Sequence, residues 1–511
     1  MSTAFKPLEI PPGVVAKPTK QMRSSNWSEV NLVRWREGQL APVGGQAQYN
    51  YSFASRCKLI HGWYGLDSVY HIAYLCESNL YVDTGGVLTE ITPAGGLTPP
   101  APYGIGGYSD GNYNDGTYGT PRDIPTVIAM DKVPDAWSLD NFGAILLAMT
   151  SPDGRLLHWD PAAGGLATVV AGAPHGRCFA VTQERFVQIF ACTQDGTTDG
   201  GSFRRFAWCD QENFASWNFS DVTSQAGFLD IEPSSPIIAC EPTRTGTLFW
   251  TGKKAYLSRF LGIPFVYNYV ELADACTPWS PASAVATSST ALWMSEQGMF
   301  SFDGTSILPV ACLVRPWVDD DIDLLQVREQ ACAVHVGDFN EFWWFFPQNG
   351  KTTNTRAIIY NYKEGWWSQA RMSRSAGVTS AYNAHTIMAD GTVAFEHEAS
   401  VVYGNADLPW AETYDLNIAS GGRLTTVKQM MPDVGGNTQS LRYSLFYRNS
   451  RSLGTPELQT APRPVRTDGF VDFRTTGRDI RLRIQVDPSS GGVLPVTVGQ
   501  HLIDAVPRGD R

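Results

Sequence analysis

Few residues of this chain have the types and the spacing that catalysis needs. The run Glu396-His397-Glu398 brings together groups that serve in general acid–base chemistry, but strand alternation would place His397 on the opposite face from both glutamates. No Gly-x-Ser-x-Gly, His-Glu-x-x-His or phosphate-binding glycine loop occurs, and the eight histidines are dispersed singly. The sequence therefore predicts a protein that is not an enzyme and that uses no cofactor.

The nine cysteines offer no metal site either. They never form a Cys-x-x-Cys pair, and most lie inside apolar runs. Such cysteines are typical of small buried side chains in a reducing compartment. The N-terminal segment has no apolar stretch behind a basic start, and no apolar run is long enough to span a membrane. We expect no stable membrane association.

The elements that must position any site are short strands. In residues 331–369, three apolar or alternating runs are separated by turns of Gly, Asn and Asp. Runs of this length, rich in aromatic and β-branched residues, are too short for helices and predict strands buried on both faces. Similar meanders occupy residues 72–83, 144–160, 178–210, 237–260, 291–304 and 378–398. This repetition predicts an all-β fold, a β-propeller of about six to eight blades, with stacked sandwiches as the alternative.

Three regions are expected along the chain. Residues 1–26, rich in Pro, Lys and Ser, predict an extended N-terminal arm. The β-propeller is predicted over 27–405, with one helix between blades at 314–333, where Pro316 starts the helix and acidic residues follow. Strict alternation in residues 406–511 predicts an appended C-terminal β-sandwich-like domain.

The C-terminal strands hold the one concentration of basic side chains in the sequence. Their alternation places the arginines on one face of each strand. These side chains could pair with an acidic neighbouring subunit, contact DNA phosphate, or be solvated. The candidate contact residues are Arg442, Arg448, Arg474, Arg481 and Arg483.

A loop insertion at 94–122 has its own composition. Tyrosines recur at every fifth residue, separated by Gly and Asp-Gly turns that cannot build a core. The segment is either a tolerated surface insertion or a set of anchors for a neighbouring subunit or partner. A calcium site from its Asp and Asn residues lacks the bidentate Glu that such loops use. The candidate contact residues are Tyr103, Tyr108, Tyr113 and Tyr118.

The chain is acidic, with a formal net charge of −11. Proteins that hold nucleic acid use a basic surface to release counterions from phosphate, so ordinary nucleic-acid binding is disfavoured. An acidic wall would instead repel a passing duplex and let it slide.

One compact string allows a family comparison. Asn31-Leu-Val-Arg-Trp-Arg-Glu-Gly-Gln-Leu-Ala-Pro-Val-Gly-Gly45 predicts two strands joined by a turn at Glu37-Gly38. It resembles the start of tail proteins from tailed bacteriophages, in which a similar string precedes a series of β-meanders. The likeness continues in the runs 249–252, 261–267, 291–294, 298–304, 341–347, 361–367 and 395–398. The class resembled is the tail hub or nozzle of short-tailed phages, related to packaged-DNA-stabilisation and tail tubular proteins.

That resemblance implies a structural function. It implies a homo-hexameric ring below the portal and head–tail adaptor, in contact with tail fibre or tail tip proteins. Viral double-stranded DNA would be retained in the ring and later ejected through it. The location would be the virion tail, after assembly in the host cytoplasm. The alternatives are a carbohydrate-active, glycosidase-like propeller, which would need paired carboxylates at its mouth, and an adaptor propeller of cellular origin.

Overall fold

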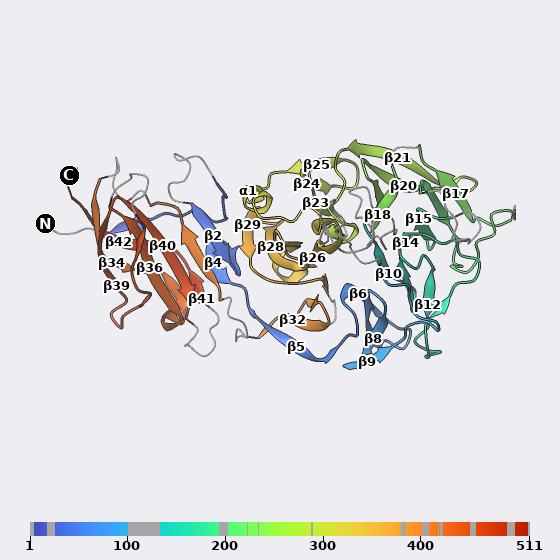
Figure 1. Cartoon of the computed structure of the whole chain (residues 1–511), viewed down its shortest axis with the longest axis horizontal. Coiled ribbons are helices and arrows are strands. Elements are labelled where there is room, and N and C mark those ends of the chain that lie inside the picture. The colour runs from blue at the N-terminus through green and yellow to red at the C-terminus, as the bar shows by residue number, and fades with distance from the viewer. Residues whose placement is uncertain are drawn as a thin grey trace, which may run out of the picture.

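The computed structural model describes residues 5–17, 26–100, 133–193, 203–221, 223–232, 235–287, 290–379, 385–400, 408–416, 418, 423–449, 456–487 and 496–508. Within these ranges, seven four-stranded antiparallel sheets occur, six with four consecutive strands in meander order and a seventh whose fourth strand comes from earlier in the chain. Their first strands pack side by side in a closed circle, β6, β10, β14, β18, β22, β26, β30 and back to β6. Figure 1 shows these sheets around a common centre. The fold is all-β, and its larger part is a seven-bladed propeller, as the sequence predicted.

Blades 1 to 3 come from the first half of the chain. Blade 1 contains β6 (Cys57–Tyr64), β7 (Tyr70–Cys76), β8 (Leu80–Thr84) and β9 (Val87–Glu90). Blade 2 contains β10 (Trp137–Phe142), β11 (Ile145–Thr150), β12 (Leu157–Trp159) and β13 (Thr168–Val169). Blade 3 contains β14 (Cys178–Val181), β15 (Val187–Phe190), β16 (Arg205–Trp208) and β17 (Gly227–Asp230).

Blades 4 to 6 continue in the same order. Blade 4 contains β18 (Ile237–Thr243), β19 (Gly246–Thr251), β20 (Lys254–Gly262) and β21 (Val266–Asp274). Blade 5 contains β22 (Ala284–Ala286), β23 (Ala291–Ser295), β24 (Gly298–Phe302) and β25 (Ile307–Val310), preceded by the 3-10 turn η1 (Pro281–Ser283). Blade 6 contains β26 (Cys332–Val336), β27 (Glu341–Pro347), β28 (Asn354–Asn361) and β29 (Trp366–Ala370), with η2 (Gly337–Phe339) inside it.

Blade 6 shows why the sequence reads as strands buried on both faces. Every residue of β27 is buried. Trp343 packs on one face, with the core shared by blades 6 and 7, while Trp344 packs on the other, in the core that reaches the C-terminal domain. Successive side chains of a strand point to opposite faces, so an unbroken apolar run fits a sheet that is covered on both sides.

Blade 7 closes the circle with strands from both ends of the propeller. It contains β30 (Ala376–Val378), β31 (Ile387–Asp390), β32 (Val393–Ser400) and β5 (Gly45–Ser52). β5 pairs antiparallel with β32, so that the strand that enters the propeller completes its last blade. This pairing holds the two ends of the propeller together by backbone hydrogen bonds within one sheet.

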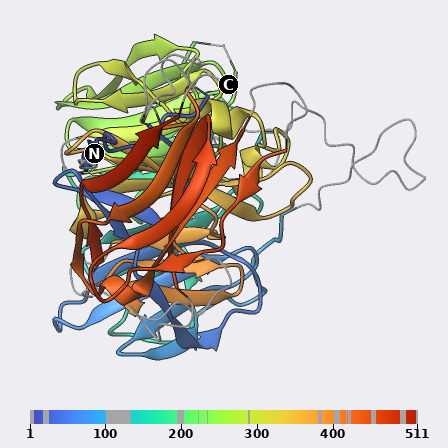
Figure 2. The same ribbon diagram turned by 90° about the vertical axis from the view of Figure 1, so that its left-hand side faces the viewer.

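The C-terminal domain consists of three further sheets, which stand in front of the propeller in Figure 2. The first contains β1 (Lys6–Leu8), β42 (His501–Pro507), β34 (Thr425–Met431) and β39 (Val471–Gly477). The second contains β2 (Trp27–Asn31), β33 (Trp410–Thr413), β40 (Asp479–Val486), β36 (Leu441–Arg448), β37 (Leu458–Gln459) and β38 (Arg463–Pro464). The third contains β3 (Val33–Arg36), β4 (Gln39–Pro42), β41 (Val496–Val498) and β35 (Val434–Gly436); η3 (Thr438–Ser440) precedes β36.

The N-terminal strands lie in this domain instead of starting the propeller. β1 pairs with β42, β2 pairs with β33, and β4 pairs with β41, so the propeller begins at β5 and not at residue 27. Trp27 and Trp35 are buried in the core that these strands share with the C-terminal strands. The turn between β3 and β4 has φ of +51° at Glu37 and +78° at Gly38, as in the two-residue turns that suit twisted hairpins.

The prediction of a single helix at 314–333 is wrong. Two short helices, α1 (Arg315–Asp319) and α2 (Val327–Gln330), stand there instead. Between them Ile322 pairs with Gln348, and the Asp323 N–H donates to the carbonyl of Pro347 at 3.1 Å. This extended stretch interrupts the helix because its backbone groups bond to the end of β27. None of the helices in the described part of the chain is long and apolar enough to cross a membrane.

Candidate carboxylate pocket at the propeller mouth

The innermost strands carry polar side chains near their carboxyl ends. The Asp140 carboxylate on β10 accepts the N–H of Val181 on β14 at 3.3 Å, and the Glu241 carboxyl on β18 accepts the N–H of Ala286 on β22 at 2.9 Å. His61 on β6 lies 4.0 Å from Asp140. The inner edge of each blade has no neighbouring strand, so side chains from adjacent blades bond its backbone groups.

A pocket of about 560 Å³ opens at this end of the inner strands, between blades 3, 4 and 5. Glu241 lines it from blade 4 and Glu184 from blade 3. The Tyr267 hydroxyl, also in the wall, lies 2.8 Å from the Thr182 hydroxyl and donates to Glu184 at 3.5 Å. Phe260 completes an aromatic side of the pocket, with its ring 5.6 Å from that of Tyr267. We call this cavity the mouth pocket.

The surroundings of Glu241 differ electrostatically from those of a glutamate in an ordinary surface cleft. Burial raises the pKa of Glu241 to about 8, and the negative charge of Asp140 adds to the rise, against the hydrogen bond from Ala286. Burial also raises the pKa of Asp140, while His61 and two backbone N–H groups oppose that rise. Glu241 is therefore mostly protonated at neutral pH and can donate a proton, the property expected of a general acid.

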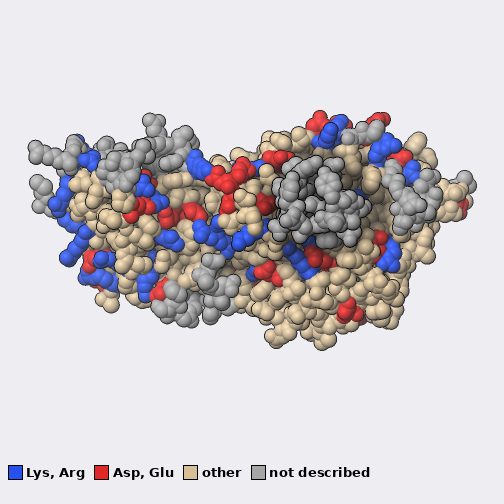
Figure 3. Space-filling view, in the orientation of Figure 1, with Lys and Arg blue, Asp and Glu red and all other residues tan. Residues whose placement is uncertain are grey.

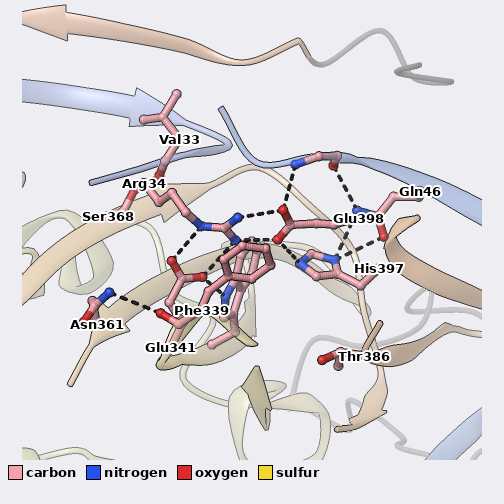
Figure 4. A network of polar contacts seen from close by, with 12 residues as sticks. Val33, Arg34, Gln46, Phe339, Glu341, Asn361, Ser368, Thr386, His397 and Glu398 are labelled. Atoms are coloured by element: carbon pink, nitrogen blue, oxygen red, sulfur yellow. Dashed lines mark hydrogen bonds and ion pairs between the residues drawn. The ribbon is translucent and has the colours of Figure 1, made fainter. Parts of the chain in front are cut away.

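A second group of carboxylates lies at the junction of the propeller and the C-terminal domain (Figure 4). Arg34 on β3 donates two hydrogen bonds to Glu341, at 2.8 and 3.0 Å, and two to Glu398, one of them at 2.6 Å. Its guanidinium carbon lies 3.7 Å from the centre of the Phe339 ring. The side chains of Arg34, Glu341 and Glu398 are 4%, 1% and 7% exposed. We call this group the junction cluster; it is closed to substrates.

The junction cluster corrects one detail of the sequence analysis. Strand β32 slips in register against β5 between Glu396 and Ser400, and Glu398 has a φ of +61°. The slip breaks the alternation, so the Glu398 carboxylate lies 3.2 Å from the His397 ring. The prediction that His397 faces away from both glutamates is wrong for Glu398. Gly44 allows the approach, because a Cβ there would lie 3.0 Å from that of Glu398.

Four of the five predicted arginines lie against acidic groups of their own domain. Arg481 binds both Glu412, at 2.6 Å, and Glu457. Arg442 pairs with Asp487, Arg448 lies 3.6 Å from Glu457, and Arg483 lies 3.7 Å from Glu412, whereas Arg474 is exposed. Basic and acidic side chains are accordingly intermixed on the face in Figure 3. The structure does not bring the arginines together with the mouth pocket.

The other predicted contact residues, Tyr103, Tyr108, Tyr113 and Tyr118, lie outside the described residues, as do the Asp and Asn residues of the calcium alternative. Within the described ranges, no group of three or more His, Cys, Asp or Glu side chains could hold a metal ion.

Sequence reasoning missed the mouth pocket. Asp140 and Glu241 are 101 positions apart in the sequence, and their electrostatic interaction arises only after the inner strands have closed into a circle. The available signal was positional: each carboxylate stands near the end of the first strand of its meander, where it is surrounded by apolar residues. A charged residue inside such a run either caps backbone or marks a site.

Comparisons with known proteins return no family. No protein-family model matches the chain, and no curated protein matches it. Among solved structures, Hsv2 of Kluyvelomyces marxianus matches at 8% identity and a TM-score of 0.30, over 51% of this chain and 71% of that one. A glycoside hydrolase matches at 10% identity and a TM-score of 0.25, over 90% and 99%. A β-fructofuranosidase from Schwanniomyces occidentalis matches at 7% identity and a TM-score of 0.22, over 91% and 98%.

These comparisons contradict the predicted function. The two structures above that match over about nine-tenths of the chain are described as a glycoside hydrolase and a β-fructofuranosidase, and none of the matches above is described as a phage tail protein. We therefore correct the predictions of a tail nozzle subunit and of a chain without enzymatic activity. The ring assembly, its partners and its location in a virion stay untested predictions. At these identities and TM-scores the matches carry no argument about substrate, so the proposal below rests on this chain's own residues.

Proposed function

We propose that the chain is a carbohydrate-active propeller that hydrolyses a glycosidic bond in the mouth pocket. The observation that carries this proposal is the pair Glu241 and Glu184, two carboxyl groups from neighbouring blades that line one open cavity of about 560 Å³. Hydrolysis of a glycoside needs one carboxylic acid and one carboxylate on either side of the scissile bond. Burial and Asp140 raise the pKa of Glu241 to about 8, so the acid is already protonated at neutral pH.

Each of the two carboxyl groups carries out one proton transfer in the reaction. Glu241 gives its proton to the oxygen of the leaving group as the bond from that oxygen to the anomeric carbon breaks. A water molecule adds its oxygen to the same carbon, and its proton passes to the Glu184 carboxylate, so atoms and charge balance over the two steps. The Tyr267 hydroxyl, 3.5 Å from Glu184, orients the carboxylate. Proton exchange with solvent then restores both groups.

The junction cluster does not fit this role, although it too contains two glutamates. Its carboxylates accept hydrogen bonds from Arg34, and the side chains of Glu341 and Glu398 are 1% and 7% exposed. A sugar could not reach them without displacing β3. Accessibility therefore separates the two clusters, and the mouth pocket is the one open to a substrate.

The experiment is a hydrolysis assay on a panel of aryl glycosides and oligosaccharides at pH 5 to 9, followed by single substitutions. Glu241→Gln and Glu184→Gln should each lower kcat by at least about 100-fold. Glu232→Gln, which removes an exposed glutamate outside the pocket, is the matched control and should leave kcat unchanged. Failure of the wild-type chain to hydrolyse any member of the panel would overturn the proposal.

A further inference from the structure

One apolar surface continues outward from the mouth pocket. Phe260 lies in the pocket wall, and the next residues form the tip of the long hairpin β20–β21. At that tip Leu261, Ile263 and Phe265 are 58%, 74% and 74% exposed. Soluble proteins rarely expose neighbouring large apolar side chains without a function for them. We call these three residues the apolar tip.

The apolar tip adjoins the pocket along one hairpin, because Phe260 and Tyr267 of the pocket wall flank the tip on β20 and β21. The ring of Phe260 lies 5.6 Å from that of Tyr267 in the pocket wall. The Tyr267 hydroxyl in turn makes hydrogen bonds with Thr182 and Glu184. A ligand held at the two glutamates and extending outward along blade 4 would leave the polar part of the pocket and meet apolar side chains. Its inner part must therefore be polar and its outer part apolar.

We propose that the substrate is a glycoside with an apolar leaving group, whose aglycone lies along the apolar tip. This inference rests on the proposed function, and it names the substrate class for that site. The sugar hydroxyls would bond the carboxyl and hydroxyl groups of the pocket, while the aglycone would bury apolar area against Leu261, Ile263 and Phe265. Each buried methylene group adds to affinity, so a longer alkyl aglycone should bind more tightly.

The test uses two probes that differ only in the aglycone, octyl β-D-glucoside below its micelle concentration and methyl β-D-glucoside. Binding is measured by isothermal titration calorimetry with the wild-type chain and with the triple variant Leu261→Ser, Ile263→Ser and Phe265→Ser. The wild-type chain should bind the octyl probe at least about ten-fold more tightly than the methyl probe. The triple variant should lose that preference and keep its binding of the methyl probe. Leu308→Ser, which removes an apolar side chain 51% exposed on β25, is the matched control.

The outcomes separate this inference from the proposed function. Glu241→Gln should retain the octyl preference, because binding does not need the proton donor. If no glycoside is hydrolysed but the preference depends on the apolar tip, then the catalytic proposal fails and the binding surface stands. Equal affinities for the two probes, or a preference that survives in the triple variant, would overturn the inference. So would a wild-type dimer in light scattering that the triple variant abolishes while the octyl preference is unchanged, since the apolar tip would then be a contact between copies.

Discussion

The junction cluster and the mouth pocket each contain two glutamates from neighbouring parts of the propeller, yet their chemistry is opposite. At the junction, burial alone would raise the pKa of Glu398, but Arg34 and His397 outweigh it and hold that pKa well below its usual range. In the mouth pocket, Glu241 accepts a hydrogen bond from the N–H of Ala286 and makes no ion pair within the described residues, so burial raises its pKa to about 8. The charge of Arg34 and the hydrogen bond from His397 therefore account for the difference.

The comparison shows how one fold uses the same residue type for two purposes. A buried carboxylate that is fully paired is inert and fixes position, since Arg34 ties β3 of the C-terminal domain to blades 6 and 7. A carboxyl group that keeps only a backbone partner remains protonated, costs stability and is available for proton transfer. The raised pKa of Glu241 and its position in an open pocket together distinguish it from the paired glutamates of the junction cluster.

Removing the Arg34 cation from the junction cluster should have the largest effect on the stability of the fold. Arg34→Met leaves Glu341 and Glu398 buried without a counter-ion, and breaking such a group should lower the free energy of unfolding by about 3–5 kcal/mol. The loss should be full at pH 7 and should shrink as the pH falls from about 4.5, the ordinary pKa of a glutamate, through the lowered pKa of Glu398 in the folded chain, because Glu398 then becomes neutral and no longer needs its counter-ion. Urea denaturation of both chains at pH 7 and at a pH below 4.5 measures this loss of stability.

The matched control for that variant is Arg36→Met on the same hairpin. Arg36 is exposed, and it lies 5.5 Å from the Phe339 ring without reaching the buried glutamates. Its loss should change stability by no more than about 0.5 kcal/mol. The triple change Arg34→Met, Glu341→Gln and Glu398→Gln should recover part of the stability, because no buried charge remains. An Arg34→Met chain as stable as the wild type would show that the cluster does not fix the junction.

The contribution of Glu241 in the mouth pocket to the free energy of unfolding should depend on pH in the opposite direction. The pKa of Glu241 is about 8 in the folded chain and 4.5 for an unperturbed glutamate, so the folded state binds the proton more tightly. Its contribution to stability is full below pH 4.5 and is lost as the pH rises through about 8, by at most about 5 kcal/mol. Glu241→Gln should be more stable than the wild type at pH 9 and equal to it at pH 4, in urea denaturation. Parallel pH profiles for the two chains would contradict a raised pKa.

Much of the fold could be predicted from the sequence because its pattern is local. Apolar runs such as 342–346, bounded by turns, indicate buried strands wherever they occur, and their repetition indicates blades. The turn at Glu37-Gly38 is likewise a local signal. The placement of β1 to β4 could not be predicted, because it depends on pairing with strands more than 370 residues further along the chain. The extended break in the segment 314–333 depends on a similar contact, with the end of β27.

The site could not be predicted for the same reason. Glu184 and Glu241 become neighbours only when blades 3 and 4 stand side by side, and nothing in either meander indicates that its glutamate faces a cavity. The arginines of the C-terminal strands were visible from alternation, but their acidic partners were not: Glu412 and Glu457 come from other strands or connections. The sequence pattern thus predicted on which face of a strand a side chain lies. The residue that it contacts on that face could be identified only from the structure.

The smallest changes in stability should come from substitutions of the arginines on the C-terminal strands. These residues extend the comparison to ion pairs that are partly exposed. The side chain of Arg481 is 25% exposed and binds two carboxylates, so Arg481→Gln should lower the free energy of unfolding by about 1 kcal/mol, far less than the loss of Arg34. Arg474→Gln, on an exposed side chain, should stay within about 0.5 kcal/mol of the wild type. Urea denaturation at low and at high salt measures both, and the Arg481 effect should decrease at high salt because its pairs are screened. A loss at Arg481 as large as that at Arg34 would mean that solvent exposure does not set the value of an ion pair in this chain.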